Sequence, residues 1–412
     1  MRVLIVSQYF WPEDFRINDL AVGLVERGHE VTVLTGIPNY PQGRFFPGYG
    51  LFKRTREAYR GVRICRVPLV PRGGGNGHRL VLNYLSFALS ATLLSPFRCR
   101  GPFDLIVVYE ISPVTVALPA LFLKKLKHAP ILFWVLDLWP ESLSATGAIR
   151  SSEVLSLLDT LVRFIYRGCD KIIVASRGFL PSITAKGIAA ERTGYFPNWY
   201  EPGYATRPAT GAVVPPGLPA GFRVMFAGNI GAAQDFGTIL SAAERLKPYR
   251  GIFWVIVGDG RRWEWVKEEV QRRGLEDRVL LLGRHPPEAM SGLFSHADAM
   301  LVTLKQDPAF ALTVPGKIQS YMACGRPIVA ALDGEGGRLI QESGAGLATP
   351  AEDADALANS VLTMYHMPKQ EREAMGDRGR EYCEKNFERG MLFDRLEGWM
   401  RQLAPNTPEI TS

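Results

Sequence analysis

The sequence predicts an α/β protein built from two doubly wound domains that face each other across a cleft. Short apolar runs alternate with segments of helical periodicity along the chain, which is typical of parallel sheets covered on both faces. This alternation stops once, after residue 200, in a stretch rich in Pro and Gly. The length of 412 residues suits two or three domains, and a composition of 47% hydrophobic and 22% charged residues excludes a disordered or fibrous chain.

The first half begins with a run of only four apolar residues after Arg2, which is too short for a secretory leader and predicts a first strand. Gly28 predicts the end of the first helix, because glycine adopts the left-handed conformation common at that position. The first domain is expected to cover residues 1–200. Its strands are expected at 2–7, 30–36, 104–109, 131–136 and 171–176, and its helices at 17–28, 114–127 and 153–167.

The second half repeats the pattern after a predicted linker at 201–221. The second domain is expected to cover 222–385, and a C-terminal helix within 386–412 is expected to pack back toward the first domain. The strands are expected at 222–228, 252–258, 278–283, 298–304 and 327–332, and the helices at 235–247, 261–273 and over most of 352–404.

The positive charge is concentrated in one block, residues 41–100. Eleven Lys or Arg face a single acid there, a surplus of ten, so the remainder carries −3 within the net charge of +7. Such a surplus favours an anionic partner. Inside the block, residues 80–97 form an apolar run flanked by Arg79 and Arg98, about 27 Å long as a helix. We expect this helix to lie in a membrane interface; a buried core helix is the alternative.

No metal site or cofactor is predicted. The five cysteines are scattered and odd in number, which favours reduced thiols in a cytoplasmic protein, and the six histidines lack metal-binding spacing. Asp353 and Asp355 stand at a predicted helix start and are interpreted as helix-terminal acids rather than metal ligands.

A ligand-binding site is expected where strands of the second half end in glycine. Three such ends share one edge, in FAGNIG (226–231), VGDGRR (257–262) and LLGRH (281–285). Glycines there suggest backbone that a ligand approaches closely, and three together favour a nucleotide. The residues expected to bind this nucleotide at these ends are Gly228, Asn229, Gly258, Asp259, Gly260 and Arg284.

The segment TVPGKIQSYMACGRPIVA (313–330) is the sharpest motif. Pro315 and Gly316 open a predicted helix, whose first amides carry partial positive charge, and Lys317 adds a cation in the first turn. This combination suits a diphosphate.

Together, these motifs resemble those of family 4 glycosyltransferases, which have the GT-B fold. In the first half, QYFWPE (8–13), RGHEVTVLTGIPNYP (27–41), DLWPES (137–142) and FPNWYE (196–201) are similar to a narrower branch. That branch contains bacterial glycosyltransferases of capsule, O-antigen and colanic acid synthesis, including fucosyl- and fucosaminyl-transferases. The resemblance covers nearly the whole chain.

The resemblance implies a retaining, metal-independent transfer of a hexosyl or amino-deoxyhexosyl group from a UDP- or GDP-sugar. The acceptor would be a polyprenyl-diphosphate-linked saccharide of exopolysaccharide or lipopolysaccharide O-antigen synthesis, bound by the first domain. The protein would then be cytoplasmic and peripheral at the inner face of the cell membrane, near an anionic surface, with no nucleic acid partner.

The chain departs from the family pattern at the donor site. The family usually carries two glutamates seven residues apart; here Ala311 and Gln319 occupy those positions. Gln319 can hydrogen-bond ribose hydroxyls, but without a carboxylate's strength. Ala232 stands where many relatives have lysine. The cations expected to bind the diphosphate are therefore Lys317 and, as helpers, Arg284, Arg261 or Arg16.

On the acceptor side, Asp137, Glu141 and Glu13 are the candidate catalytic carboxylates, and Arg16 and Asn198 are candidate cleft residues. Asp137 ends a predicted buried strand, and the alternative is that it caps the following helix.

Two other functions stay open on the sequence. A nucleotide-sugar 2-epimerase on the same fold needs no lipid acceptor and leaves the basic, apolar block unexplained. A nucleic-acid-binding protein would use the arginines but leave the phosphate-binding features idle.

Overall fold

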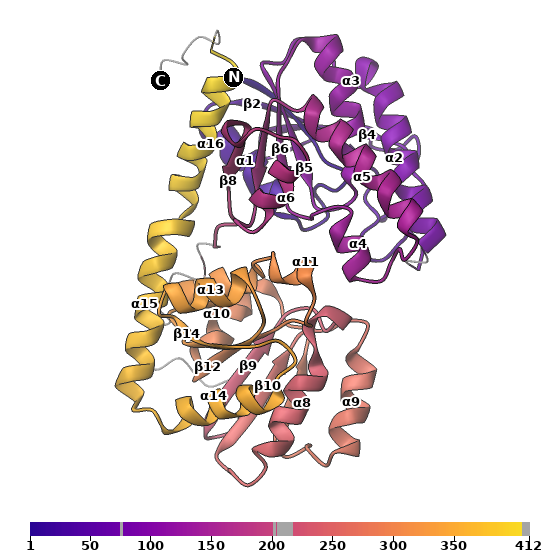
Figure 1. Ribbon diagram of the computed structural model, residues 1–412. Coiled ribbons are helices and arrows are strands. Elements are labelled where there is room, and N and C mark those ends of the chain that lie inside the picture. The colour runs from indigo at the N-terminus through magenta and orange to yellow at the C-terminus, as the bar shows by residue number, and fades with distance from the viewer. Residues whose placement is uncertain (75–76, 201–202, 204–216, 406–412) are drawn as a thin grey trace. The chain divides into compact units, whose positions relative to one another are not determined.

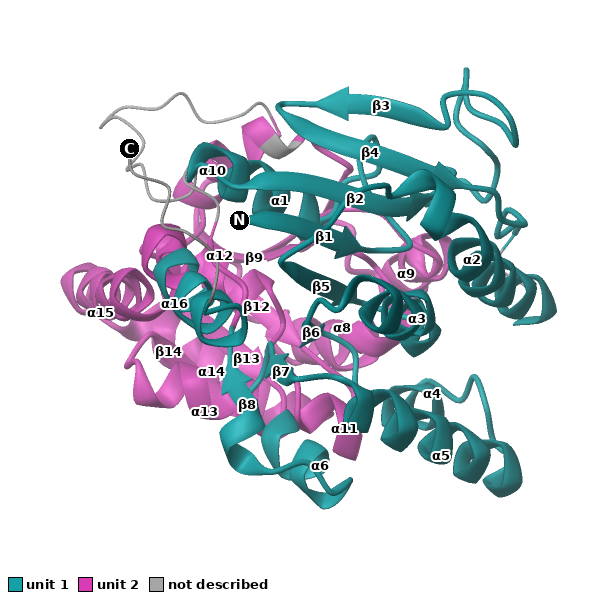
Figure 2. Cartoon of the chain, turned by 90° about the horizontal axis from the view of Figure 1, so that it is seen from above, with its two compact units in different colours: residues 1–196, 393–412 teal, residues 197–392 magenta. Residues whose placement is uncertain are grey.

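The computed structural model describes residues 1–74, 77–200, 203 and 217–405 (Figure 1). The chain divides into two compact units: unit 1 is residues 1–196 with 393–412, and unit 2 is residues 197–392 (Figure 2). Most of the predicted linker at 201–221 lies outside the described residues.

Unit 1 contains an eight-stranded sheet in the order β3-β4-β2-β1-β5-β6-β7-β8. All neighbouring strands are parallel except β3 and β4, which form an antiparallel hairpin. The central strands are buried on both faces, which explains their continuous apolar runs. The strands are β1 (Arg2–Val6), β2 (Glu30–Gly36), β3 (Arg56–Tyr59), β4 (Val62–Val67), β5 (Leu105–Glu110), β6 (Ile131–Val135), β7 (Lys171–Val174) and β8 (Thr193–Tyr195).

Helices cover both faces of this sheet, with α2 and α3 side by side (Figure 2). The helices are α1 (Arg16–Glu26), α2 (Gly77–Arg98), α3 (Ala117–Lys127), α4 (Glu141–Ala145), α5 (Ser152–Gly168) and α6 (Phe179–Ala185). The basic block is more structured than the sequence indicated, because it contains the β3–β4 hairpin. One of its cations, Arg66, is buried in the fold: its Nε donates to Glu57 at 2.7 Å and its NH1 to the Gly36 carbonyl at 3.1 Å.

The last helix, α16 (Arg389–Leu403), is tied to unit 1 through its residues from 393 onward. Glu397 accepts hydrogen bonds from Arg27 at 3.0 Å and pairs with His29 Nε2 at 2.9 Å. The Trp399 ring lies 6.1 Å from the Phe196 ring, and a Cβ on Gly194 would stand 2.8 Å from it. These contacts join α16 to β8 and the end of α1.

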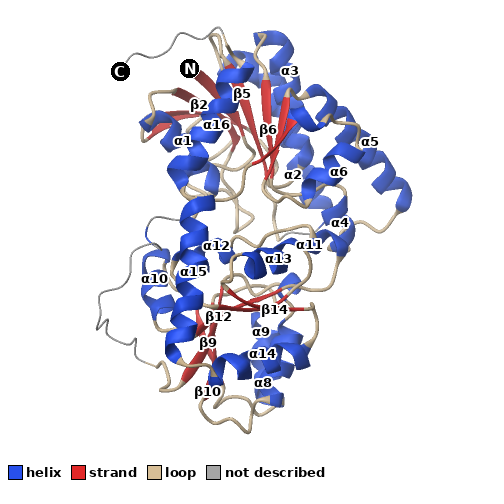
Figure 3. Ribbon diagram, turned by 60° about the vertical axis from the view of Figure 1, so that its left-hand side comes forward, coloured by secondary structure: helices blue, strands red, loops and turns tan. Residues whose placement is uncertain are grey.

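Unit 2 contains a six-stranded, entirely parallel sheet in the order β11-β10-β9-β12-β13-β14 (Figure 3). Its strands are β9 (Phe222–Ala227), β10 (Ile252–Val257), β11 (Val279–Gly283), β12 (Ala299–Thr303), β13 (Ile328–Ala331) and β14 (Gly346–Thr349). Its helices are α8 (Phe236–Arg245), α9 (Trp263–Arg272), α10 (Pro287–Ser295), α11 (Pro308–Ala311), α12 (Lys317–Ala323), α13 (Glu335–Glu342), α14 (Ala354–His366) and α15 (Lys369–Phe387).

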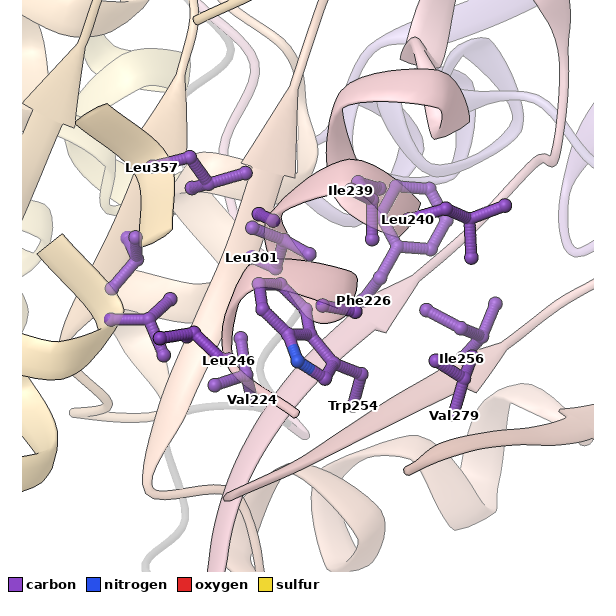
Figure 4. Packing of buried hydrophobic residues seen from close by; sticks show 14 of the residues in the cluster. Val224, Phe226, Ile239, Leu240, Leu246, Trp254, Ile256, Val279, Leu301 and Leu357 are labelled. Atoms are coloured by element: carbon purple, nitrogen blue, oxygen red, sulfur yellow. The ribbon is translucent and has the colours of Figure 1, made fainter. Parts of the chain in front are cut away.

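The core of unit 2 fills the space between the sheet and α8, α9 and α14 (Figure 4). Trp254 from β10 is 1% exposed, and Phe226 from β9 packs edge-on against Phe236 with ring centres 4.9 Å apart. Asp353 caps α14 by accepting the Ala356 N–H at 2.8 Å, which confirms its interpretation as a helix-terminal acid. The core places the ends of β9, β10 and β11 at one edge of the sheet.

Candidate active site

The glycine-bearing loops at the ends of β9, β10 and β11 are bonded to one another. The Gly228 N–H donates to the Val257 carbonyl at 2.9 Å, and the Gly258 N–H donates to the Gly283 carbonyl at 2.8 Å. The Ile230 N–H donates to the Asp259 carbonyl, also at 2.9 Å. The structure therefore brings the three predicted strand ends together as one rigid edge of unit 2.

Loop-on-loop packing explains two of these glycines. A Cβ on Gly258 would stand 1.9 Å from the Gly228 carbonyl oxygen, and one on Gly260 would stand 2.4 Å from the Ile230 carbonyl oxygen. Both contacts are with protein backbone, so neighbouring loops, rather than a ligand, account for the lack of a side chain at these two positions. Gly228 differs, because a Cβ there would stand 3.3 Å from the Lys317 ammonium nitrogen.

Gly258→Ala is expected to destabilise unit 2 strongly, by about 3 kcal/mol or more, because the added methyl group meets backbone and φ is +139°. Gly283→Ala is the matched control: its φ is +71°, but nothing lies within 4 Å of the new Cβ, so we expect a loss of only about 1 kcal/mol. Urea unfolding of both variants checks this. Equal losses of unfolding free energy in the two variants would show that the loops do not need this packing.

Lys317 is the main cation of this edge. It is the first residue of α12, and its ammonium lies 3.7 Å from the centre of the Phe226 ring. The ammonium nitrogen is buried, and among the described residues it has neither a hydrogen-bond partner nor a paired carboxylate. Burial lowers the pKa of Lys317 to about 7. A buried ammonium without a counter-charge is costly, and an anion at this position would remove the cost.

The other predicted donor-binding residues differ in accessibility. Asn229, Asp259, Arg284 and Gly316 are exposed at the same strand ends and loop, whereas Pro315 is half-buried. Asp259 is partly engaged, because its carboxylate accepts the Gly260 N–H at 2.7 Å.

Gln319 is 2% exposed, below the loop rather than on its surface. With its amide nitrogen turned toward the loop, it donates to the carbonyl oxygens of Gly316 and Pro315 at 3.0 and 3.3 Å. This arrangement makes Gln319 a residue that holds the loop before Lys317; its contact with a ribose stays a prediction.

In unit 1, Glu13 organises the loops that follow β1 and β2. One carboxylate oxygen accepts the N–H groups of Asn39 and Tyr40, both at 2.7 Å, and the other accepts the Phe10 N–H at 3.3 Å. The side chain is buried, and burial raises its pKa to about 7 despite these bonds. The geometry gives Glu13 a positioning role; catalysis by Glu13 stays a prediction.

Asp137 follows β6 and lies beside a second carboxyl group that the sequence analysis missed, Glu110 at the end of β5. Glu110 accepts the Asp137 N–H at 3.4 Å and is 1% exposed; its Oε1 is buried without a partner among the described residues. Burial and the nearby Asp137 raise the pKa of Glu110 well above its ordinary value. Burial also raises the pKa of Asp137, which accepts the Trp139 indole N–H at 3.2 Å.

Glu141, the other predicted carboxylate of DLWPES, is paired inside unit 1. It binds the Lys186 ammonium at 3.0 Å, and Lys186 also binds Asp159 at 2.6 Å. Lys186 is 5% exposed, so this three-residue group joins α4, α5 and the end of α6. Asp137 is therefore the better placed of the two carboxylates to meet a substrate.

A tyrosine-bound cation lies at the same edge of unit 1. Arg72 donates to the Tyr9 hydroxyl at 2.8 Å and lies over the Tyr40 ring, 5.1 Å from its centre. The Tyr84 ring from α2 lies edge-on to the Trp139 ring, with ring centres 6.4 Å apart, and the Trp139 indole N–H donates to Asp137. The basic block thus supplies a specific cation to the site.

Two predicted cleft residues, Arg16 and Asn198, stand on different units. Arg16 is the first residue of α1 and is half-buried. Asn198, also half-buried, falls just after the boundary of unit 1. Among the described residues, no three or more His, Cys, Asp or Glu side chains are grouped so that they could hold a metal ion.

Both halves of the chain match glycosyltransferase families. Residues 15–199 match the family described as glycosyl transferase 4-like domain, and residues 221–367 match glycosyl transferases group 1. A protein of Escherichia coli (strain K12) described as a colanic acid biosynthesis glycosyl transferase is 27% identical over 406 residues, covering 94% of this chain and 97% of that protein. These matches do not favour the epimerase and nucleic-acid alternatives.

Solved structures share the fold over nearly the whole chain. Anabaena HepE in complex with UDP superposes with a TM-score of 0.70 at 16% identity, covering 98% of this chain and all of that one. The sucrose-phosphate synthase of Thermosynechococcus elongatus superposes with a TM-score of 0.76 at 18% identity, with the same coverage. The two parallel sheets, the shared fold and the family matches to both halves together lead to one conclusion: the chain is a glycosyltransferase with the GT-B fold.

Proposed function

We propose that the protein transfers a sugar from a UDP- or GDP-sugar to a lipid-linked saccharide, with retention of anomeric configuration, in the synthesis of a bacterial cell-surface polysaccharide. The observation that carries the donor half of this proposal is the buried, unpaired ammonium of Lys317 at the end of β9. A nucleoside diphosphate is the anion that this position of a parallel α/β sheet suits best. The UDP complex of Anabaena HepE, which shares the fold, supports this choice.

The donor's diphosphate would lie over Gly228, where the backbone is exposed and Lys317 is directly beside it. Exposed Arg284 and Arg261, at the ends of β11 and β10, are the helper cations on the same unit. As the bond between sugar and diphosphate breaks, negative charge grows on the leaving phosphate. A fixed, desolvated cation stabilises that charge more than water does, since it needs no reorganisation.

The acceptor half rests on unit 1. Asp137 is the carboxylate proposed to orient the acceptor hydroxyl or the sugar, and Glu110 holds the Asp137 backbone from behind. Arg72, whose remaining guanidinium N–H groups carry no hydrogen bond to any described residue, is proposed to bind the acceptor's phosphates. The similarity to a colanic acid biosynthesis protein supports a polysaccharide pathway.

The proposed chemistry uses no fixed nucleophile. The acceptor oxygen attacks the anomeric carbon on the face that the leaving diphosphate vacates, and the leaving phosphate oxygen accepts the hydroxyl proton. One glycosidic bond forms as the sugar–phosphate bond breaks. A transfer assay with UDP- and GDP-sugars and a polyprenyl-diphosphate-linked saccharide tests the reaction; inversion of the anomeric centre in the product would contradict it.

At alkaline pH, the protein is expected to take up a proton when the donor binds. Lys317 is largely neutral above its pKa of about 7 in the free protein, and a bound diphosphate favours the ammonium form. The affinity for the nucleoside diphosphate should therefore fall by up to about tenfold per pH unit above pH 7. Calorimetry at about pH 8.5 in two buffers of different ionisation enthalpy measures this uptake.

In the free protein, the titration of Lys317 makes folding stability rise with pH, whereas the affinity for the diphosphate falls with pH. In the unfolded chain Lys317 keeps its proton to about pH 10.4, so between pH 7 and 10 the unfolded state binds more protons. The contribution of Lys317 to stability therefore rises with pH in that window.

In the calorimetric test, binding of the nucleoside diphosphate without proton uptake would exclude Lys317 from the diphosphate site.

A further inference from the structure

Exposed apolar side chains gather on three helices of unit 1. Among the described residues, sixteen large hydrophobic side chains are exposed, and eleven of them belong to α2, α3 and α5. Unit 2 contributes only Tyr249 to the described set. A contiguous group of this kind is rare on a soluble surface and marks a contact with a partner or a membrane.

The polarity of α2 is inverted relative to a helix that faces water. Its outward side chains include Leu85, Leu89 and Leu93, which are 53%, 63% and 61% exposed. Its polar residues point inward: Asn83 donates to the Val70 carbonyl at 2.6 Å, and Ser90 donates to the Pro68 carbonyl at 2.5 Å. A surface helix in water normally presents the opposite arrangement. The buried-core alternative for this helix is therefore wrong.

The neighbouring helices extend the apolar face. α3 packs beside α2, and α5 packs beside α3, in agreement among the three views (Figures 1, 2 and 3). Phe122 and Leu126 of α3 are 42% and 48% exposed, and Leu157 and Phe164 of α5 are 69% and 61% exposed. We refer to the outer surface of α2, α3 and α5 as the three-helix face.

The attachment of α2 indicates that it lies along a membrane rather than across it. Its 22 residues are long and apolar enough to span a bilayer by length and composition. Its inner side, however, is hydrogen-bonded to residues 68–70 of the same unit, and Phe87 and Ala91 are buried against the unit. Crossing the bilayer would break these contacts.

The charges around the three-helix face suit anionic headgroups. Arg79, Arg100 and Lys125 are exposed at the ends of α2 and on α3, and Arg98 is half-exposed. Of the acids on α5, Asp159 is already paired with Lys186 and Arg163. A rim of cations beside exposed leucine and phenylalanine side chains is the pattern of an interfacial helix on an acidic bilayer.

We propose that unit 1 docks on the surface of an anionic lipid bilayer through the three-helix face, with α2 lying in the interface. This docking goes beyond sugar transfer and does not depend on the donor site. It also gives a physical route for the acceptor, because the Tyr84 ring of α2 lies against Trp139, whose indole N–H donates to Asp137.

Flotation of the full chain with lipid vesicles tests the proposal. We expect the protein to float with vesicles that mix phosphatidylcholine and phosphatidylglycerol. The double variant Leu89→Asn, Leu93→Asn should lose at least about tenfold in partitioning, because two half-exposed leucines no longer enter the acyl boundary. The matched control, Leu51→Asn with Phe52→Asn, removes two exposed apolar side chains outside the face and should float as the wild type does.

A charge variant tests the headgroups separately. Arg79→Gln with Arg100→Gln should weaken binding to the mixed vesicles by about tenfold or more and leave binding to pure phosphatidylcholine unchanged. Absence of wild-type flotation would overturn the proposal, as would a wild-type dimer that dissociates in the leucine variant without any vesicle binding. Stabilisation by nucleoside diphosphates, measured on the same samples, reports folding and the donor site independently.

Discussion

Lys317→Met is expected to reduce sugar transfer by about 10²–10³-fold while leaving the fold intact. Methionine keeps the length of the side chain and its contact with the Phe226 ring but removes the charge. The loss should appear in the transfer rate at saturating acceptor, because the missing cation acts on the leaving diphosphate. The measurement is transfer of labelled sugar by the variant and wild type.

The same substitution should make the ligand-free protein more stable. The wild-type ammonium is buried without a counter-charge, so its removal relieves a desolvation cost. Lys267→Met, on the exposed face of α9, is the matched control and should change neither activity nor stability appreciably. A Lys317→Met protein that transfers sugar at the wild-type rate would remove the basis for the donor site.

Asp137→Asn is expected to reduce transfer by about 10²–10⁴-fold without weakening nucleotide binding. Asparagine keeps an oxygen that can accept the Trp139 indole N–H, so the loop after β6 should hold its shape. Only the negative charge is lost. Steady-state kinetics and nucleotide titration on the same preparation separate the two effects.

Two further variants make this result specific. Asp14→Asn removes an exposed carboxylate from the loop after β1 and should leave transfer unchanged. Glu110→Gln keeps the size and the accepting oxygen of a buried acid whose pKa burial raises well above its ordinary value, and it should keep most of the activity, whereas Glu110→Ala removes the support of the Asp137 loop. Unchanged transfer by Asp137→Asn would exclude this carboxylate from catalysis.

The sheets were predictable because each central strand is a continuous apolar run bounded by glycine or polar residues. The strand at 30–36 has the predicted bounds, and that at 131–135 is one residue shorter than predicted. The β3–β4 hairpin was missed because its first strand, REAY, alternates charged and apolar residues over only four positions at the sheet edge. Such a strand gives little periodicity to read.

The place of Lys317 in the first turn of a helix could be predicted from the sequence because its motif stands between recognisable strand and helix signals. The hydrogen-bond and ion-pair partners of other candidate site residues could not be predicted from the sequence. Glu141 binds Lys186 across 45 residues, and Glu110 reads simply as the polar end of a buried strand. The apolar stripe of α5 was predicted as helical, but leucines that face a core and leucines that face outward have the same spacing.

The central claim is that unit 2 binds the diphosphate of a nucleotide-sugar through Lys317. The most direct test is the thermal stability of the purified chain with UDP, GDP, dTDP and ADP, measured beside Lys317→Met. We predict that UDP or GDP selectively raises the melting temperature of the wild type, and that this rise disappears in the folded variant. A folded wild-type protein that no nucleotide stabilises, or a variant stabilised as strongly as the wild type, would contradict the account.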